Sequence, residues 1–266
     1  MSKPKALVLT GYGINCEEET AFAFNLAGGE AKIVHINDLI AGKVNLKNFQ
    51  ILAFPGGFAY GDNTGSGVAF ANRLRSYLWA ELAQFIKGDK LIIGICNGFQ
   101  MLTNLGFLPA LDSEYGQRQV VLAHNESTKY TARWVDMEVE TRSPWLEGIK
   151  KLSLPIAHGE GKLVATDEVL EKLKQNKQVA LRYFKGEICE YQDLAVNPTG
   201  TIDNIAGLVD PSGKILGLMP HPERAIFFTH RPDWPYLKEK YLREGKTLPD
   251  EGLGLQIFKN AIKYFK

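Results

Sequence analysis

Cys96 is the side chain whose neighbours best suit it to act as a nucleophile. It lies in GICNG (residues 94–98), between an apolar run of β-forming residues and a segment with apolar residues at helical spacing. This G-x-C-x-G spacing is the cysteine version of the sharp strand-to-helix turn that exposes a nucleophile at the end of a sheet. A thiol at a helix N-terminus also lies near the positive end of the helix dipole, which favours the thiolate. The alternative is a structural cysteine, since cysteine is among the most buried residue types.

A thiol nucleophile needs a base, and the base needs a group that orients it. Among five histidines, His221 in MPHPERA is the strongest candidate. The flanking prolines favour an extended backbone, on which the side chains of His221 and Glu223 leave on the same side. We therefore expect Cys96, His221 and Glu223 to be catalytic. The alternative is a turn in which Glu223 pairs with Arg224 or a nearby lysine.

The other histidines are weaker candidates for the base. His158, in PIAHGEG, is the second choice, because it also lies in a glycine-rich segment next to an apolar run. His35, His124 and His230 are more typical of surface or packing positions. The sequence thus leaves His158 as the alternative to His221.

Two segments could form the oxyanion hole that a tetrahedral intermediate requires. Such a hole needs two backbone N–H groups directed at the developing oxyanion. The amide of Asn97 follows the nucleophile directly, and a turn at Gly56-Gly57, after an apolar strand, could present the second donor. The alternative is a turn that only bounds a helix. The tract from Gly57 to Gly67 lacks the Gly-Lys-Ser/Thr of a phosphate loop, so no nucleotide site is predicted there.

Composition excludes several other classes of protein. The net charge is +1, from 31 basic and 30 acidic residues, and no basic run argues for nucleic acid or a membrane surface. No apolar run approaches the roughly 20 residues of a membrane span, and the N-terminus lacks the apolar region of a signal peptide. The three cysteines are far apart, which argues against disulfides and against a C-x-x-C zinc site. We expect a cytoplasmic protein without a metal centre.

The elements that must position these residues alternate between strand and helix in the first half of the chain. Expected strands are Ala6–Thr10, Lys32–Ile36, Gln50–Phe54 and Leu91–Ile93, and expected helices are Glu17–Leu26, a short one from Asp38, and Val68–Ile86. This alternation predicts an α/β fold with a doubly wound, mainly parallel sheet flanked by helices. The carboxyl ends of its strands share one edge, where ligands bind. Cys96 and His221 should meet there.

The second half is richer in strands. Those expected are Arg118–Ala123, Arg133–Glu140, Gln178–Tyr183, Ile205–Asp210 and Lys214–Met219, with helices at Asp167–Lys174 and Gly254–Phe265. The turn Asp210-Pro211-Ser212-Gly213 should join the last two strands as a hairpin. Residues 1–266 read as a single domain, with a polar and aromatic excursion at residues 227–251.

Several segments together resemble the class I (triad) glutamine amidotransferases, and more narrowly the glutaminase subunits of phosphoribosylformylglycinamidine synthase. The segments are GICNGFQ, PGGFAYGD, PIAHGEG and MPHPERA, with Asn15-Cys16, RWV, VALRY, NPTG and IFKNA in support, so that the resemblance covers almost the whole chain. It implies a flavodoxin-like fold. The short subunits of that family lack much of residues 227–251, so the surface near the excursion departs from the family pattern.

The resemblance assigns a role to each candidate residue. It implies that Cys96 is the nucleophile and that His221 and Glu223 complete the triad. It places Gly57 and Asn97 in the oxyanion hole. The residues implied to bind glutamine are Gly56, Phe58, Gln100, His158 and Gly159. His158 then becomes a binding residue instead of the base.

The resemblance also implies partners. Ammonia from glutamine would pass to a synthetase subunit that amidates formylglycinamide ribonucleotide, with a small accessory subunit in the same complex. No cofactor is expected on this chain, whereas ATP and Mg²⁺ are expected on the synthetase subunit. Purine synthesis and glutamine both come from the resemblance, since the motifs alone predict only acyl transfer by a cysteine.

Two other hypotheses are compatible with a cysteine in such a turn. A cysteine peptidase or stress-type protein of the same fold commonly has its base directly after the nucleophile, where this chain has Asn97. A catalytically dead binding subunit would have lost Cys96, His221 or Glu223, and all three are present. Both alternatives are therefore disfavoured.

Overall fold

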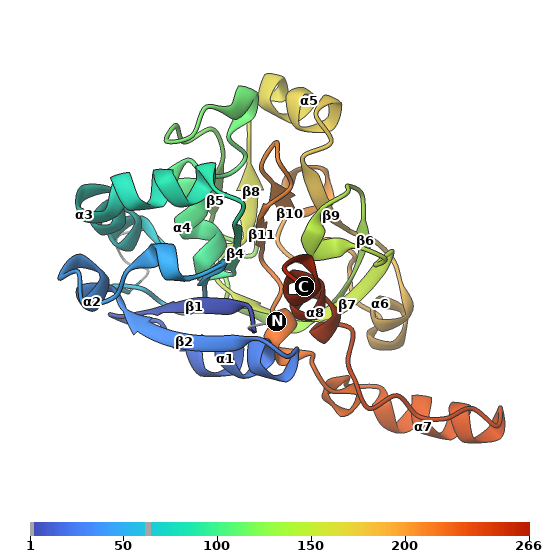
Figure 1. Cartoon of the computed structure of the whole chain (residues 1–266). Helices are drawn as coiled ribbons and strands as arrows, with labels where there is room; N and C mark the ends of the chain where they lie inside the picture. Colours follow the sequence, from blue (N-terminus) through green and yellow to red (C-terminus); the bar gives the residue numbers. More distant parts are fainter. Residues whose placement is uncertain (1–2, 62–64) are drawn as a thin grey trace.

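A mixed β-sheet runs through the molecule, with helices packed on both of its faces (Figure 1). The computed structural model describes residues 3–61 and 65–266. Within these residues nine strands form the main sheet, in the order β2-β1-β3-β4-β11-β10-β9-β6-β7. The strands are β1 (Lys5–Thr10), β2 (Glu30–His35), β3 (Ile51–Phe54), β4 (Leu91–Ile95), β6 (Thr131–Val139), β7 (Lys151–His158), β9 (Val179–Tyr183), β10 (Ile205–Val209) and β11 (Ile215–Leu218).

The sheet has a parallel and an antiparallel part. The strands β2, β1, β3, β4 and β11 pair in parallel, whereas β10, β9, β6 and β7 extend the sheet by antiparallel pairing. Every residue of β3, β4, β10 and β11 is buried, as expected for strands covered on both faces. The predicted α/β doubly wound fold is confirmed, and its parallel part carries the strands that end at the candidate site.

Eight α-helices lie in the described parts of the chain, and both faces of the sheet are covered by helices (Figure 1). They are α1 (Glu17–Leu26), α2 (Ile36–Ile40), α3 (Val68–Lys87), α4 (Asn97–Leu105), α5 (Asp167–Gln175), α6 (Glu187–Gln192), α7 (Trp234–Arg243) and α8 (Leu255–Tyr264). On one face α1 packs beside α8, where the rings of Phe24 and Phe258 meet edge to face at 4.9 Å. On the other face α3 packs beside α4 (Figure 1). A small second sheet pairs β5 (Val121–Ala123) with β8 (Lys162–Val164).

The predicted hairpin is confirmed, because β10 and β11 pair in antiparallel fashion across the turn that begins at Asp210. The buried Asp210 carboxylate accepts hydrogen bonds from the amides of Ser212 and Ile215 and from the hydroxyl of Tyr115. Such side-chain bonds to the local backbone are what favour aspartate in turns. The hairpin fixes β11, from which the segment with His221 emerges.

Strand β7 was not predicted from the sequence. Its residues alternate between buried and partly exposed, with Leu152, Leu154 and Ile156 buried. Pro155 occupies one of the partly exposed positions, but a proline normally argues against a strand. β7 is the last strand of the sheet, so no neighbouring strand on its outer side requires a hydrogen bond from residue 155. The Pro155 carbonyl accepts a hydrogen bond from the backbone N–H of His221 at 2.8 Å.

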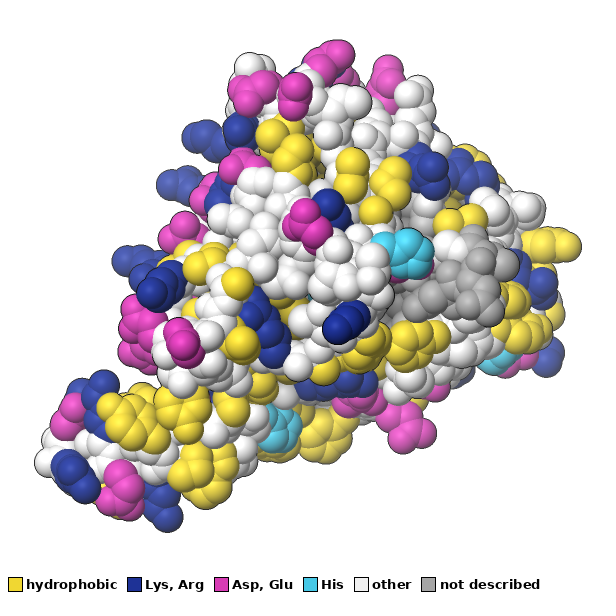
Figure 2. Space-filling view, turned by 180° about the vertical axis from the view of Figure 1, so that it is seen from behind, with side chains coloured by type: hydrophobic (Ala, Val, Ile, Leu, Met, Phe, Trp, Pro, Cys, Tyr) yellow, Lys and Arg dark blue, Asp and Glu magenta, His cyan; other side chains and the backbone are white. Residues whose placement is uncertain are grey.

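The excursion at residues 227–251 contains α7, which projects from the body of the molecule (Figure 1). Its base is held by a bridge between Phe227 and Glu251 and by stacking of Phe228 on Tyr241. Figure 2 shows apolar side chains gathered on this projection. Tyr236 and Leu242 of α7 are both largely exposed. The sequence analysis expected an excursion here but did not predict its helix.

Candidate active site

Cys96 lies on a strained turn between β4 and α4, as the G-x-C-x-G spacing predicts. Its backbone adopts φ 51° and ψ −107°, a conformation that a residue with a side chain rarely takes. A Cβ on Gly94 would lie 2.7 Å from the carbonyl oxygen of Gly98, and one on Gly98 would overlap the carbonyl of Phe54. Both glycines are therefore required where the helix approaches the sheet so closely. The turn presents the Cys96 thiol at the carboxyl end of β4.

Replacing Gly98 by alanine tests this close approach. Gly98 does not have a positive φ, so the added methyl group acts only through its collision with Phe54 in β3. We expect the free energy of unfolding to fall by about 1–3 kcal/mol, the range for overpacking. Urea denaturation measures the change. Gly88→Ala is the matched control, because a Cβ there meets the flexible Lys90 side chain first, at 3.3 Å. Equal stability of the two variants would contradict the steric role of Gly98.

His221 lies beside Cys96 because their strands are neighbours. The register pairs Ile95 of β4 with Leu218 of β11, and the Cys96 N–H donates to the Leu218 carbonyl at 2.8 Å. The Cys96 sulfur in turn lies 3.8 Å from the carbonyl oxygen of Ala157, near the end of β7. Three strands that are distant in sequence thus converge on the thiol.

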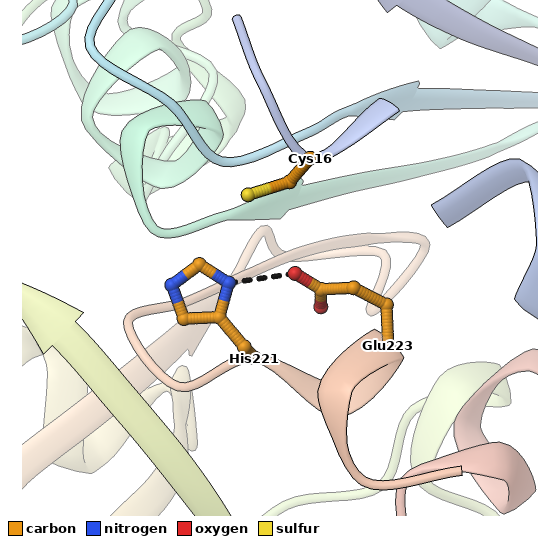
Figure 3. Close-up of side chains that lie close together, drawn as sticks. All are labelled: Cys16, His221 and Glu223. Carbon is orange, nitrogen blue, oxygen red and sulfur yellow. Dashed lines mark hydrogen bonds and ion pairs between the residues drawn. The ribbon is translucent and has the colours of Figure 1, made fainter. Parts of the chain in front are cut away.

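Glu223 orients the His221 ring, but not by the local structure predicted. We expected one extended segment, whereas only His221 is extended and a 3₁₀ turn covers Pro222–Arg224. Proline suits the first position of such a turn because its φ is already helical. The turn brings a Glu223 carboxylate oxygen to 2.6 Å from His221 Nδ1 (Figure 3). The carboxylate therefore fixes the tautomer in which Nδ1 carries the proton and Nε2 can accept one.

The electrostatics of the site favour a charged His221 ring. Burial by itself would lower the pKa of His221, but the Glu223 carboxylate and the Cys96 sulfur outweigh burial and raise that pKa well above its usual value. Nε2 is buried and has no hydrogen-bond partner among the described residues. It is therefore free to exchange a proton with a group brought into the site.

His158 is poorly suited to be the base. It ends β7 and is buried, and its Nδ1 lies 3.3 Å from the side-chain oxygen of Asn125. Burial, reinforced by the nearby His221, lowers the pKa of His158 to about 3, so the ring stays neutral at neutral pH. The structure thus separates the two histidines that the sequence left as alternatives, with only His221 beside a carboxylate.

The Gly56-Gly57 turn is held in place by the loop after β1. Gly57 has φ 155°, and a Cβ on it would lie 2.7 Å from both the Gly13 carbonyl and Ile14 Cα. The Phe58 N–H donates to the Gly13 carbonyl at 2.8 Å, and the Cys16 N–H donates to the Gly56 carbonyl at 3.2 Å. No described residue accepts a hydrogen bond from the Gly57 N–H, so this donor remains available.

Asn97 and Gln100 connect the start of α4 to the two loops beside it. The Asn97 side chain accepts from the Ala59 N–H at 3.1 Å and donates to Gln100 at 2.8 Å. Gln100 Nε2 donates to the Glu160 carbonyl at 2.6 Å. The polar atoms of Gln100 are thus used inside the protein, which makes it a positioning residue for the loop after His158. The sequence predicted a role for the backbone amide of Asn97 but not for its side chain.

The remaining residues implied to bind glutamine border the thiol in different ways. Phe58 is 39% exposed and its ring lies 6.2 Å from that of Tyr130. Gly159 follows His158, and no atom lies within 4 Å of where its Cβ would be. Gly56 packs against the His221 ring. Gly56 and His158 therefore lie near His221, Phe58 follows the Gly56-Gly57 turn, and Gly159 follows His158.

Cys16 is a neighbour of His221 that the analysis of chemical motifs missed. It is buried in the loop between β1 and α1, and its sulfur accepts a hydrogen bond from Arg224 at 3.0 Å. Arg224 also donates to Glu19 at 3.1 Å. Burial raises the pKa of the Cys16 thiol, although the His221 ring beside it has the opposite effect. The only signal in the sequence was Asn15-Cys16, which entered as part of the family resemblance.

No helix in the described parts of the chain is long and apolar enough to cross a membrane. A model of the CobB/CobQ-like glutamine amidotransferase domain matches residues 3–265.

Curated relatives and a solved structure narrow the family. The chain is 47% identical to the phosphoribosylformylglycinamidine synthase subunit PurQ of Methanococcus maripaludis strain S2, with 98% of this chain and 97% of the relative covered. It is 44% identical to the PurQ subunit of Dehalococcoides mccartyi, with 99% and 98% covered. The structure of PurLQS from Thermotoga maritima matches with a TM-score of 0.72 and 30% identity over 99% of this chain and 100% of that one. The chain therefore belongs to the glutamine amidotransferases and, within them, to the PurQ family.

Proposed function

We propose that this chain is the glutaminase subunit of phosphoribosylformylglycinamidine synthase, with Cys96 as its nucleophile. It hydrolyses glutamine to glutamate and ammonia, and the ammonia passes to a synthetase subunit. That subunit uses ATP to convert formylglycinamide ribonucleotide to formylglycinamidine ribonucleotide, a step of purine biosynthesis. The observation that carries the proposal is a strained cysteine turn beside a buried histidine–glutamate pair, in a chain of this family.

The acyl transfer begins with attack of the Cys96 sulfur on the side-chain amide carbon of glutamine. His221 Nε2 takes the thiol proton, and the Glu223 carboxylate stabilises the resulting imidazolium. The tetrahedral oxyanion accepts hydrogen bonds from the backbone amides of Gly57 and Asn97. When it collapses, the C–N bond breaks, His221 returns the proton to the leaving nitrogen, and ammonia departs.

Hydrolysis then regenerates the thiol. Water attacks the thioester carbon and gives a proton to His221, and the same two amides stabilise the second oxyanion. The C–S bond breaks, His221 reprotonates the sulfur, and glutamate leaves. The loop from His158 to Gly159, held by Gln100, and the Gly56–Phe58 turn are suited to hold the glutamine on either side of the thiol.

Partners and location follow from this proposal. The ATP and Mg²⁺ that the amidation needs belong to the synthetase subunit, because the tract from Gly57 to Gly67 lacks the Gly-Lys-Ser/Thr sequence of a phosphate loop. A small accessory subunit completes the complex, and the whole is cytoplasmic. This chain carries no cofactor for the hydrolysis.

The experiment compares the glutaminase rate of the chain alone with its rate at increasing concentrations of purified synthetase subunit. Free hydrolysis would waste glutamine, so we expect docking to accelerate the reaction by about 10²–10³-fold, the value of one oxyanion-hole donor. The candidate switch is the Gly57 peptide, in the loop Pro55–Gly67, of which residues 62–64 lie outside the described residues. Formylglycinamidine ribonucleotide formation from glutamine is the second readout. An isolated chain already at its full rate would contradict the switch, and a complex that uses ammonium but never glutamine would contradict the function.

A further inference from the structure

Three side chains of different chemistry surround one buried point next to the catalytic base. They are the thiol of Cys16, the imidazole of His221 and the carboxylate of Glu223, and one potential ligand atom from each lies within 4.8 Å of the other two. Figure 3 shows Cys16 approaching the His221 ring from a different element than Glu223 does. All three residues are at least 98% buried. Sulfur, nitrogen and oxygen donors of these types are the ligands that Zn²⁺ takes in proteins.

The space between them exists because residue 56 is a glycine. A Cβ on Gly56 would lie 3.0 Å from the Cys16 sulfur, 2.8 Å from His221 Cε1 and 3.4 Å from His221 Nδ1. The sulfur thus lies on the Nδ1 side of the ring, which is also the side that the Glu223 carboxylate contacts. Any side chain at position 56 would collide with both the Cys16 sulfur and the His221 ring.

The Glu223 carboxylate has one oxygen without a partner in the described parts of the chain. The second carboxylate oxygen of Glu223 is buried and accepts no hydrogen bond from a described residue. A buried anionic oxygen without a donor is costly, and a cation beside it would remove that cost. This orphan oxygen is an observation independent of the spacing of the three groups, and it points to a positively charged ligand.

We infer that Cys16, His221 Nδ1 and Glu223 form a binding site for Zn²⁺, and that the bound ion reversibly inhibits the glutaminase. No residue of the family's catalytic machinery other than His221 and Glu223 is needed for the site. The fourth position of a tetrahedral ion would be filled by water. The inhibition rests on the proposed role of His221 as the base, whereas the binding does not.

Proton balance explains why the ion would inhibit. Zn²⁺ replaces the proton of the Cys16 thiol, which leaves to solvent, and forms a bond to the thiolate. It also binds His221 Nδ1, so the proton on Nδ1 of the charged ring leaves to solvent while the proton on Nε2 stays. A ring protonated at Nε2 cannot accept the proton of Cys96, and acyl transfer stops. No bond is oxidised or reduced, and a chelator reverses the change.

Binding the ion requires all three ligands to move, and atoms that now lie up to 4.8 Å apart must close to about 3.3–3.6 Å. The 2.6 Å between His221 Nδ1 and the Glu223 oxygen must open to about 3.3 Å, given zinc–ligand bonds of about 2.0–2.2 Å at tetrahedral angles. Arg224 must release the Cys16 sulfur, but it keeps its hydrogen bonds to Glu19. Mg²⁺ should not substitute, because it prefers oxygen ligands at octahedral geometry.

Zinc binding is tested first in chains that lack the nucleophile, so that a Cys96–His221 site cannot contribute. Equilibrium dialysis against buffered Zn²⁺ measures zinc per chain in Cys96→Ala alone and combined with Cys16→Ser, with His221→Ala, or with Cys189→Ser. Cys189→Ser is the matched control, since Cys189 is an equally buried thiol outside the cluster. Serine suits position 16 because it is a preferred residue at a helix N-cap, which position 16 is for α1. Thermal unfolding checks that each variant is folded.

We expect one zinc per chain in Cys96→Ala and in its Cys189→Ser combination. Cys16→Ser and His221→Ala should each weaken binding by more than about 100-fold, since even outer partners of a ligand are worth about 10–100-fold. With Co²⁺ as the probe, a thiolate-to-metal absorption band should appear and be lost on Cys16→Ser. Unchanged binding in Cys16→Ser, or none in Cys96→Ala, would overturn the site.

The second experiment measures glutamine hydrolysis by the wild-type chain and by Cys16→Ser. For each chain the rate with Zn²⁺ is compared with the rate of the same chain without Zn²⁺. Zn²⁺ should abolish wild-type glutamine hydrolysis, EDTA should restore it, and Mg²⁺ at the same concentration should have no effect. Cys16→Ser should need at least about 100-fold more zinc for the same inhibition. Zinc bound at Cys16 without loss of activity would refute the inhibition and the assignment of His221 as base together, while leaving the metal site intact.

Discussion

Cys96→Ala should abolish glutamine hydrolysis, with a loss in kcat on the order of 10⁶, as for removal of the nucleophile from a triad. The methyl group of alanine fits the same strained turn, because the two flanking glycines and the hydrogen bond to Leu218 stay in place. The fold should therefore be unchanged. Release of glutamate and ammonia from glutamine measures the effect directly.

A control separates chemistry from assembly. The complex of Cys96→Ala with the synthetase subunit should still amidate formylglycinamide ribonucleotide when ammonium salt replaces glutamine, because that step lies on the partner. Cys189→Ala, at a buried cysteine far from the thiol turn in sequence, should hydrolyse glutamine normally. Substantial glutamine turnover by Cys96→Ala would show that another group attacks the amide.

His221→Ala should be nearly as damaging, again on the order of 10⁶, since members of a triad act as a unit. Glu223→Gln should cost less, on the order of 10⁴, because an orienting carboxylate contributes less than the base itself. The glutamine side chain keeps an oxygen near Nδ1 but no longer supplies the charge that holds the His221 pKa above its usual value. The pKa of His221 should therefore fall in Glu223→Gln, and the part of the kcat/KM profile that reports this ring should move to lower pH.

His158 provides the contrasting variant. Its lowered pKa makes it a poor proton acceptor at neutral pH, so His158→Gln should act mainly on KM for glutamine. The comparison of kcat and KM among His221→Ala, Glu223→Gln and His158→Gln therefore separates the base from a binding residue. A wild-type rate in His221→Ala together with a lost rate in His158→Gln would reverse the two assignments.

Local chemistry explains why the cysteine turn could be predicted from the sequence. The two glycines around Cys96 are required by contacts within a few residues and one neighbouring strand, and a period change from strand to helix marks the position. The meeting of Cys96 with His221 followed from the rule that parallel strands share a carboxyl edge. Only the register, Ile95 opposite Leu218, had to come from the structure.

Features that depend on tertiary contacts could not be predicted in the same way. Strand β7 could not be predicted because it contains Pro155. A proline is compatible with a strand mainly at the edge of a sheet, and the sequence does not specify which strand lies at the edge. The 3₁₀ turn of Pro222–Arg224 gives the same His221–Glu223 contact that an extended segment was expected to give, so the right pair came from the wrong local structure. Cys16 lies more than two hundred residues from His221 in sequence, and only the folded chain brings them together.

The hydrogen bond from Cys96 to Leu218 has a consequence for how the protein loses activity on heating. Cys96 and His221 directly follow or lie close after adjacent central strands, whose ladder is buried and should open only when the whole sheet does. The distance between them is therefore not set by a loop that could melt early. Thermal inactivation of the chemistry should coincide with global unfolding, so that a stabilised core would by itself give a more heat-resistant enzyme.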